Sequence, residues 1–81
     1  MNISKRKKNE KAFGDWEELK SGGRIYFFEV EGRNNRKAIY KKETDANEKT
    51  IKFWQEIYDD RNRLIEIHEK FPIDKGHKKI K

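Results

Sequence analysis

The fold is decided by residues 50–71, which read TIKFWQEIY, then DDRNR, then LIEIHEKF. Two runs rich in β-branched and aromatic residues flank a polar cluster, and this pattern is typical of a β-hairpin. Asn62 can adopt the left-handed conformation that a three-residue loop at 60–62 requires. Such a loop pairs residue 59 with 63, 57 with 65, 55 with 67, 53 with 69 and 51 with 71.

This register sorts the side chains of the hairpin onto two faces. The apolar face carries Ile51, Phe53, Ile57, Ile65, Ile67 and Phe71. The opposite face carries Lys52, Trp54, Glu56, Tyr58, Leu64, Glu66, His68 and Lys70. Pro72 has no N–H to donate to a ladder, so it is expected to end the second strand.

The preceding residues continue the same pattern upstream. Residues 24–30 and 37–41 are predicted strands, with turns at 32–35 and 45–48. Residues 15–20 fit either a strand that turns at 21–23 or a short helix capped by Asp15, and the strand is favoured. We therefore expect a mainly β fold, a twisted antiparallel meander of four to five strands. It would form a small barrel-like structure or a one-layer sheet. Such an aromatic-rich sheet would curl into a barrel, be covered by the N-terminal segment or dimerise through the Trp54–Tyr58 face, and curling is favoured.

Positive charge is concentrated at the two ends of the chain. The 81 residues hold 21 Lys and Arg against 15 Asp and Glu. Residues 1–11 carry +4, residues 75–81 carry +4 and residues 12–74 carry −2, which together make the net charge of +6. We expect a basic flexible arm over 1–11, a single small β domain over 12–74 and a basic, disordered tail over 75–81.

Several classes of function are disfavoured by composition. There is no cysteine and only two histidines, so disulfides, cysteine metal sites and His-rich metal sites are not expected. Phosphate-binding glycine loops and nucleophile elbows are absent from the sequence. No apolar run approaches membrane-spanning length and no secretory signal is evident, so the expected location is the cytoplasm, without membrane contact. No cofactor or metal is expected.

The charge distribution favours binding to nucleic acid, and RNA more than DNA. Lysines and arginines on the arms would contact phosphates, as would a second basic cluster at and after the 32–35 turn. Tyr26 or Tyr40 could stack on a base. The residues predicted to bind nucleic acid are Lys5, Arg6, Lys7, Lys8, Arg33, Arg36, Lys37, Lys41, Lys42, Lys78 and Lys79.

An alternative function is that of a small, metal-independent ribonuclease. In the predicted register Glu56 faces Glu66, and Trp54 faces His68. A carboxylate at Glu56 or Glu66 could take a 2′-hydroxyl proton while His68 protonates the leaving oxygen, with Lys52 or Lys70 stabilising the phosphorane. This grouping on an antiparallel sheet resembles the layout of barnase-like and RelE-like ribonuclease toxins, which implies a toxin–antitoxin component. His77 is expected to lie in a frayed end.

A second alternative is a protein–protein interaction module, such as an antitoxin or inhibitor. Its binding surface would be the face that carries Trp54 and Tyr58, and the same face could form a homodimer. This hypothesis predicts a specific protein partner and no binding to nucleic acid at physiological salt.

Overall fold

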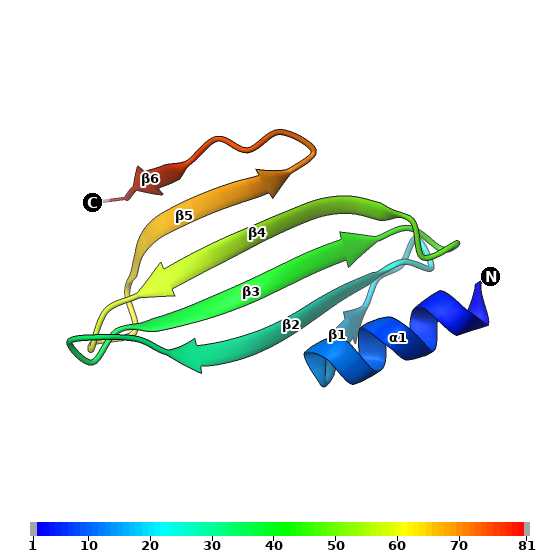
Figure 1. The fold of residues 1–81 in the computed structure, drawn as a ribbon, viewed down its shortest axis with the longest axis horizontal. Helices are drawn as coiled ribbons and strands as arrows, with labels where there is room; N and C mark the ends of the chain where they lie inside the picture. Colours follow the sequence, from blue (N-terminus) through cyan, green and yellow to red (C-terminus); the bar gives the residue numbers. More distant parts are fainter. Residues whose placement is uncertain (1, 81) are drawn as a thin grey trace.

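The computed structural model describes residues 2–80, which form one open antiparallel sheet with a single helix packed on it (Figure 1). The six strands follow the order of the chain from one edge of the sheet to the other. The expected mainly β meander is confirmed, with one strand more than predicted. The sheet stays open and does not curl into a barrel. The elements are α1 (Ile3–Phe13), β1 (Asp15–Glu18), β2 (Arg24–Glu31), β3 (Lys37–Thr44), β4 (Thr50–Tyr58), β5 (Leu64–Phe71) and β6 (His77–Lys79).

Three of the hairpin turns share a single backbone pattern. In the β4–β5 turn the N–H of Asn62 donates to the carbonyl of Asp59, and the N–H of Asp59 donates to the carbonyl of Arg63. Asn62 has a φ of 61°, so the predicted three-residue loop with a left-handed third residue is confirmed. The β1–β2 and β3–β4 turns repeat these bonds, with Gly22 and Glu48 at the left-handed position.

The predicted register of the β4–β5 hairpin is wrong beyond its first pair. Tyr58 pairs with Leu64 as expected, but Ile57 then pairs with Glu66 and leaves Ile65 as an unpaired extra residue, a β-bulge. A second bulge lies at Lys70. Because side chains alternate along a strand, the first bulge moves Glu66 and His68 to the face that carries Phe53 and Ile57, and moves Ile67 to the other face. The hydrophobic alternation of the sequence contains no signal for this extra residue.

Residues 3–11 of the predicted basic arm are helical, because residues 3–13 form α1. The side chain of Asn2 caps the helix by accepting from the N–H of Lys5, and Gly14 ends it in the left-handed conformation with φ 86°. The helix packs against β1 and β2 through Phe13, whose ring lies 5.9 Å from that of Tyr26 and 5.4 Å from that of Phe28.

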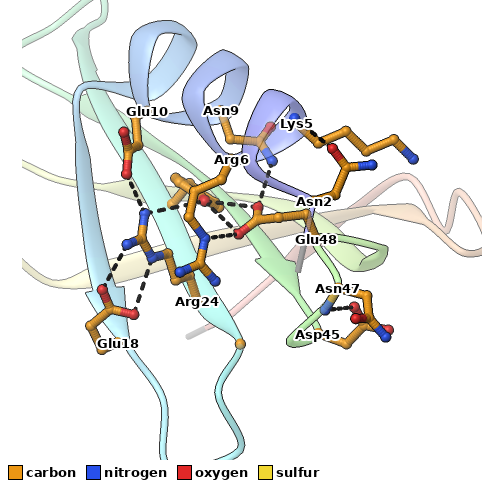
Figure 2. A network of polar contacts seen from close by, with 12 residues as sticks. Asn2, Lys5, Arg6, Asn9, Glu10, Glu18, Arg24, Asp45, Asn47 and Glu48 are labelled. Atoms are coloured by element: carbon orange, nitrogen blue, oxygen red, sulfur yellow. Dashed lines mark hydrogen bonds and ion pairs between the residues drawn. The ribbon is translucent and has the colours of Figure 1, made fainter.

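A buried polar cluster joins α1 to the sheet (Figure 2). Its centre is Glu48, which is 2% exposed and lies in the β3–β4 turn. Its carboxylate accepts from Arg6 Nε at 2.7 Å, from Asn9 Nδ2 at 3.1 Å and from the hydroxyl of Tyr26 at 2.8 Å. Arg24 lies beside this cluster and bridges α1 to β1 by ion pairs with Glu10 and Glu18. Residues 6–10 of the helix are therefore held by directed polar contacts rather than by an apolar stripe.

The tail predicted over 75–81 is likewise partly ordered, since β6 extends the sheet. Glu66 pairs with Lys79, Ile67 with Lys78 and His68 with His77. Residue 81 of the predicted tail and residue 1 of the predicted arm lie outside the described residues.

The Glu48 cluster predicts a loss of stability in acid. Burial disfavours the charged form of Glu48, but hydrogen bonds from Arg6, Tyr26 and Asn9 outweigh that effect and hold its pKa below the ordinary value. A depressed pKa in the folded state stabilises the fold at pH values above the unfolded pKa of about 4.3, and this stabilisation is lost as the pH falls through the folded pKa. We expect the Glu48→Gln variant to be less stable than the wild type at neutral pH and to lose less stability between about pH 5 and pH 3. Urea denaturation at several pH values in this range gives the free energy of unfolding of each protein as a function of pH. The control is Glu31→Gln, which replaces an exposed glutamate.

Candidate functional site

Strand pairing arranges the side chains of one sheet face in three cross-strand rows. We call this the helix-side face, because α1 packs on it through Phe13. The first row is Trp16, Tyr26, Lys42, Phe53 and Phe71; the second is Phe28, Tyr40, Gln55, His68 and His77; the third is Val30, Ala38, Ile57, Glu66 and Lys79. The opposite face, called the open face, is covered by no other element among residues 2–80.

An aromatic hollow of about 320 Å³ lies beside α1 on the helix-side face. Phe13, Phe53 and Phe71 line it together with Lys42 and Thr50. Phe71 is 43% exposed, so a ring at the mouth of this hollow is available to a ligand.

A basic hollow of about 300 Å³ adjoins the aromatic one and shares Lys42 and Thr50 with it. Lys5 and Lys8 of α1, Lys42 of β3 and Lys49 of the β3–β4 turn converge here. The ammonium of Lys42 donates to the side-chain oxygen of Asn9 at 2.9 Å. None of these four lysines forms a salt bridge with another residue of the 2–80 range.

The predicted nucleic-acid residues do not form one surface. Arg6 points inward to Glu48 and is not available as an arm residue. Lys37 and Lys41 lie on the open face, where they are at ion-pair distance from Glu29 and Glu56. The remaining positions divide among the elements: Lys5, Lys7 and Lys8 are on α1, Lys42 and Lys79 are on the helix-side face, Lys78 is on the open face, and Arg33 and Arg36 are in the β2–β3 turn.

The structure therefore brings together Lys5, Lys8 and Lys42 and adds Lys49, which the sequence analysis did not select. The signal for Lys49 is its position directly before the strong strand pattern, at a turn. Nothing in the sequence places that turn against the N-terminal residues.

The predicted catalytic residues are divided between the two faces. Glu56 lies on the open face and accepts from Trp54 Nε1 at 3.0 Å and the hydroxyl of Tyr58 at 2.9 Å, with Lys41 Nζ at 3.2 Å. Burial disfavours its charge, yet these three donors lower its pKa below the ordinary value. Glu66 and His68 lie on the helix-side face. The predicted Glu56–Glu66 pair is therefore wrong, and the β-bulge at Ile65 is the reason.

Glu66 and His68 instead belong to a cluster that the structure completes with Asp74 and His77. His68 Nε2 lies 2.6 Å from Asp74 Oδ1, and the rings of His68 and His77 are 4.4 Å apart. His77 Nδ1 lies 3.6 Å from Glu66 Oε1. The backbone N–H of Gly76 and the ring of His68 lower the pKa of Asp74, so this carboxylate is ionised beside the imidazole. The expectation that His77 lies in a frayed end is wrong, because it pairs with His68 in β6.

Trp54 and Tyr58 share the open face, as the protein-partner hypothesis requires. Both donate to Glu56, and Lys52 Nζ lies 5.0 Å from the centre of the Trp54 ring. The structure contains one chain, so binding of a partner or a second copy to this face stays a prediction.

Within residues 2–80, no group of three or more histidine, aspartate or glutamate side chains is arranged to hold a metal ion. No helix in this range has the length and apolar character needed to cross a membrane.

No family model, curated protein or solved structure significantly matches this chain.

Glu56 and Glu66 lie on opposite faces of the sheet, so replacing one or the other is expected to change the pKa of Tyr58 differently. Burial, and then the hydrogen bond to Glu56, raise the pKa of Tyr58 to about 12. We expect Glu56→Gln to lower this pKa because it removes the neighbouring negative charge, and Glu66→Gln to leave it unchanged. An alkaline titration followed by NMR of the Tyr58 ring measures the value. An equal effect of both variants would place both carboxylates on one face and contradict the register described above.

Proposed function

We propose that this protein binds single-stranded nucleic acid, RNA in preference to DNA, on the helix-side face of its sheet. The observation that carries the proposal is the direct connection of the aromatic hollow with the basic hollow through Lys42 and Thr50. The aromatic hollow can stack its rings on a base, and the lysines of the basic hollow can bind a phosphate. Each nucleotide of a nucleic acid strand contains a base and a phosphate.

The basic hollow suits phosphate because its lysines form no salt bridge among residues 2–80, and the Glu48 carboxylate that also lines it is bound by Arg6, Asn9 and Tyr26. Several other cations of the structure do have such partners, Arg6, Arg24 and Lys41 among them. An already paired cation gains little from a phosphate, since it must give up an existing contact. Lys5, Lys8 and Lys49 have no such contact to lose, and Lys42 has only its hydrogen bond to the Asn9 amide. Binding of a phosphate there releases counterions from the strand.

The aromatic hollow suits an unstacked base. Stacking of a base on an aromatic ring contributes about 1–3 kcal/mol and needs an accessible ring face. Phe71 provides an exposed ring, and Lys70 Nζ, 5.9 Å from the centre of the Phe53 ring, adds a cation beside the hollow. Proteins that read single-stranded RNA on a β-sheet combine stacking with such backbone contacts.

This mode of binding differs from contact by flexible arms. The lysines of α1 are presented by a helix that Glu48 fixes to the sheet, so fewer side chains must be ordered when RNA binds. The helical conformation also places only some of its lysines at the basic hollow. Lys5 and Lys8 line the hollow, whereas Lys7 and Lys11 are exposed residues outside it.

That separation provides a matched test of the basic hollow. We expect Lys5→Gln, Lys8→Gln and Lys49→Gln together to weaken RNA binding and to reduce the slope of log K against log salt by about 2, because about 0.7 is lost per phosphate contact on a single strand. The control, Lys7→Gln, Lys11→Gln and Lys20→Gln, removes the same charge from exposed positions outside the hollow. The readout is fluorescence anisotropy of an end-labelled single-stranded RNA, with DNA of the same sequence alongside.

Equal slopes for the two triple variants would show that charge alone attracts the RNA and would reject the hollow as its site. Absence of binding by the wild type at physiological salt would reject the proposed function. Tighter binding of the DNA would reject the preference for RNA.

A second variant tests the aromatic hollow without changing the charge. We expect Phe71→Leu to weaken RNA binding at least fivefold, which corresponds to about 1 kcal/mol, because leucine keeps apolar contact but cannot stack on a base. Ile73→Ala is the control, since Ile73 is 65% exposed and lies outside the hollow. The same anisotropy titration gives both affinities, and unchanged binding by Phe71→Leu would contradict a base in this hollow.

A further inference from the structure

We propose that Glu66 and His77 form an acid–base pair that cleaves RNA bound on the helix-side face, through attack of the 2′-hydroxyl on the adjacent phosphodiester. This inference rests on the proposed function for its substrate. It differs from the sequence hypothesis in its residues: Glu56 is absent and His77 supplies the imidazole.

The pair has the geometry of two groups that act on one phosphodiester. His77 Nδ1 is 3.6 Å from Glu66 Oε1, which is ion-pair distance but longer than a hydrogen bond. The two groups are thus close enough to address the same ribose and phosphate without being locked to each other. The side chain of His77 is 47% exposed, so the imidazole is accessible to a substrate.

The surroundings of Glu66 can hold the phosphate. A hollow of about 520 Å³ is lined by Glu66 together with Arg36 and Lys79, and Lys79 is the direct cross-strand neighbour of Glu66. Neither cation forms a salt bridge within the described part of the chain. Two cations around a carboxylate are the arrangement needed to bring a polyanion to a general base and to stabilise the charge that develops on phosphorus.

His68 and Asp74 position the pair. The Asp74 carboxylate lies 2.6 Å from His68 Nε2, and the His68 ring lies against that of His77. The other ring nitrogen of His68 is buried and without a partner among residues 2–80. His68 therefore has no free edge for a substrate, and we assign it as a positioning residue rather than as the acid.

The site is continuous with the proposed binding surface. Phe71 of the aromatic hollow and His68 are both on β5, three residues apart, which is about 10 Å along a strand. A strand of RNA with a base beside Phe71 can therefore pass the imidazole cluster without leaving the face.

The reaction balances without a metal or cofactor. The Glu66 carboxylate accepts the proton of the 2′-hydroxyl as the 2′-oxygen forms a bond to phosphorus. The bond from phosphorus to the 5′-oxygen breaks, and protonated His77 gives its Nε2 proton to that oxygen. The products are a 2′,3′-cyclic phosphate and a 5′-hydroxyl, and exchange of one proton with water restores both groups.

The test separates cleavage from binding. Wild-type protein is incubated with end-labelled single-stranded RNA, and the products are analysed for a 2′,3′-cyclic phosphate end. Affinity is measured separately on RNA of the same sequence with 2′-O-methyl groups, which lacks the nucleophile. We expect cleavage by the wild type, and a loss of at least 100-fold in His77→Gln and in Glu66→Gln with affinity for the methylated RNA retained. Lys78→Gln is the matched control, because Lys78 lies on the same strand with its side chain on the other face.

The positioning role of His68 has its own readout. We expect His68→Gln to reduce kcat with little change in KM, since the residue does not touch RNA.

Binding of methylated RNA without cleavage of ordinary RNA would overturn the inference and leave the proposed function standing. Cleavage undiminished in both His77→Gln and Glu66→Gln would overturn it too. Absence of binding to the methylated RNA would reject the proposed function, and the inference with it.

Discussion

The buried carboxylate of Glu48 is the interaction on which the arrangement of this protein depends. Glu48 occupies the left-handed position of a three-residue turn with φ 64°, where the equivalent turns carry Gly22 and Asn62. A glutamate is strained at such a position. The contacts of its carboxylate with Arg6, Asn9 and Tyr26 offset that strain and tie the helix to the sheet. The sheet alone offers only a small apolar core, in which Tyr26 is the one hydrophobic residue fully buried among those described. The polar cluster therefore holds the helix on the sheet, as a larger apolar core does in a larger domain.

Fixing α1 also determines which cations are available to a ligand. Arg6 and Arg24 are drawn inward by glutamates, whereas Lys5 and Lys8 line the rim of a hollow on the outside. The net charge of the chain is thus a poor guide to where a polyanion would bind. What matters is where cations without a salt bridge lie close together, and four of them, Lys5, Lys8, Lys42 and Lys49, line one hollow where α1 meets the β3–β4 turn. The same docking places Phe13 beside Phe53, so the basic and aromatic hollows have a common origin.

The sequence predicts the parts of this fold that depend on local pattern. Alternation of apolar residues and turn chemistry are sufficient for the hairpins and for the left-handed Asn62. The helix escapes prediction because the residues that contact the rest of the fold, Arg6, Asn9 and Phe13, are mostly polar and show no hydrophobic periodicity. Their partner, Glu48, is distant in sequence and belongs to an otherwise ordinary turn. The β-bulge at Ile65 escapes prediction for a different reason: apolar residues occur on both sides of it, so either register leaves a plausible apolar face.

The bulge at Ile65 determines which face of the sheet carries Glu66 and His68. In the uninterrupted register, Glu66 and His68 would share a face with Glu56, whose carboxylate is already occupied by Trp54, Tyr58 and Lys41. The extra residue turns Glu66 and His68 to the helix-side face, next to Lys79 and His77. The titratable pair and the two hollows then lie on one surface, although they come from opposite ends of the chain. An acid–base pair can act on a polymer only if the polymer is held beside it. In this sheet both conditions would depend on contacts outside regular strand pairing: Glu48 fixes the helix that lines the basic hollow, and the bulge at Ile65 brings Glu66 and His68 to the same face.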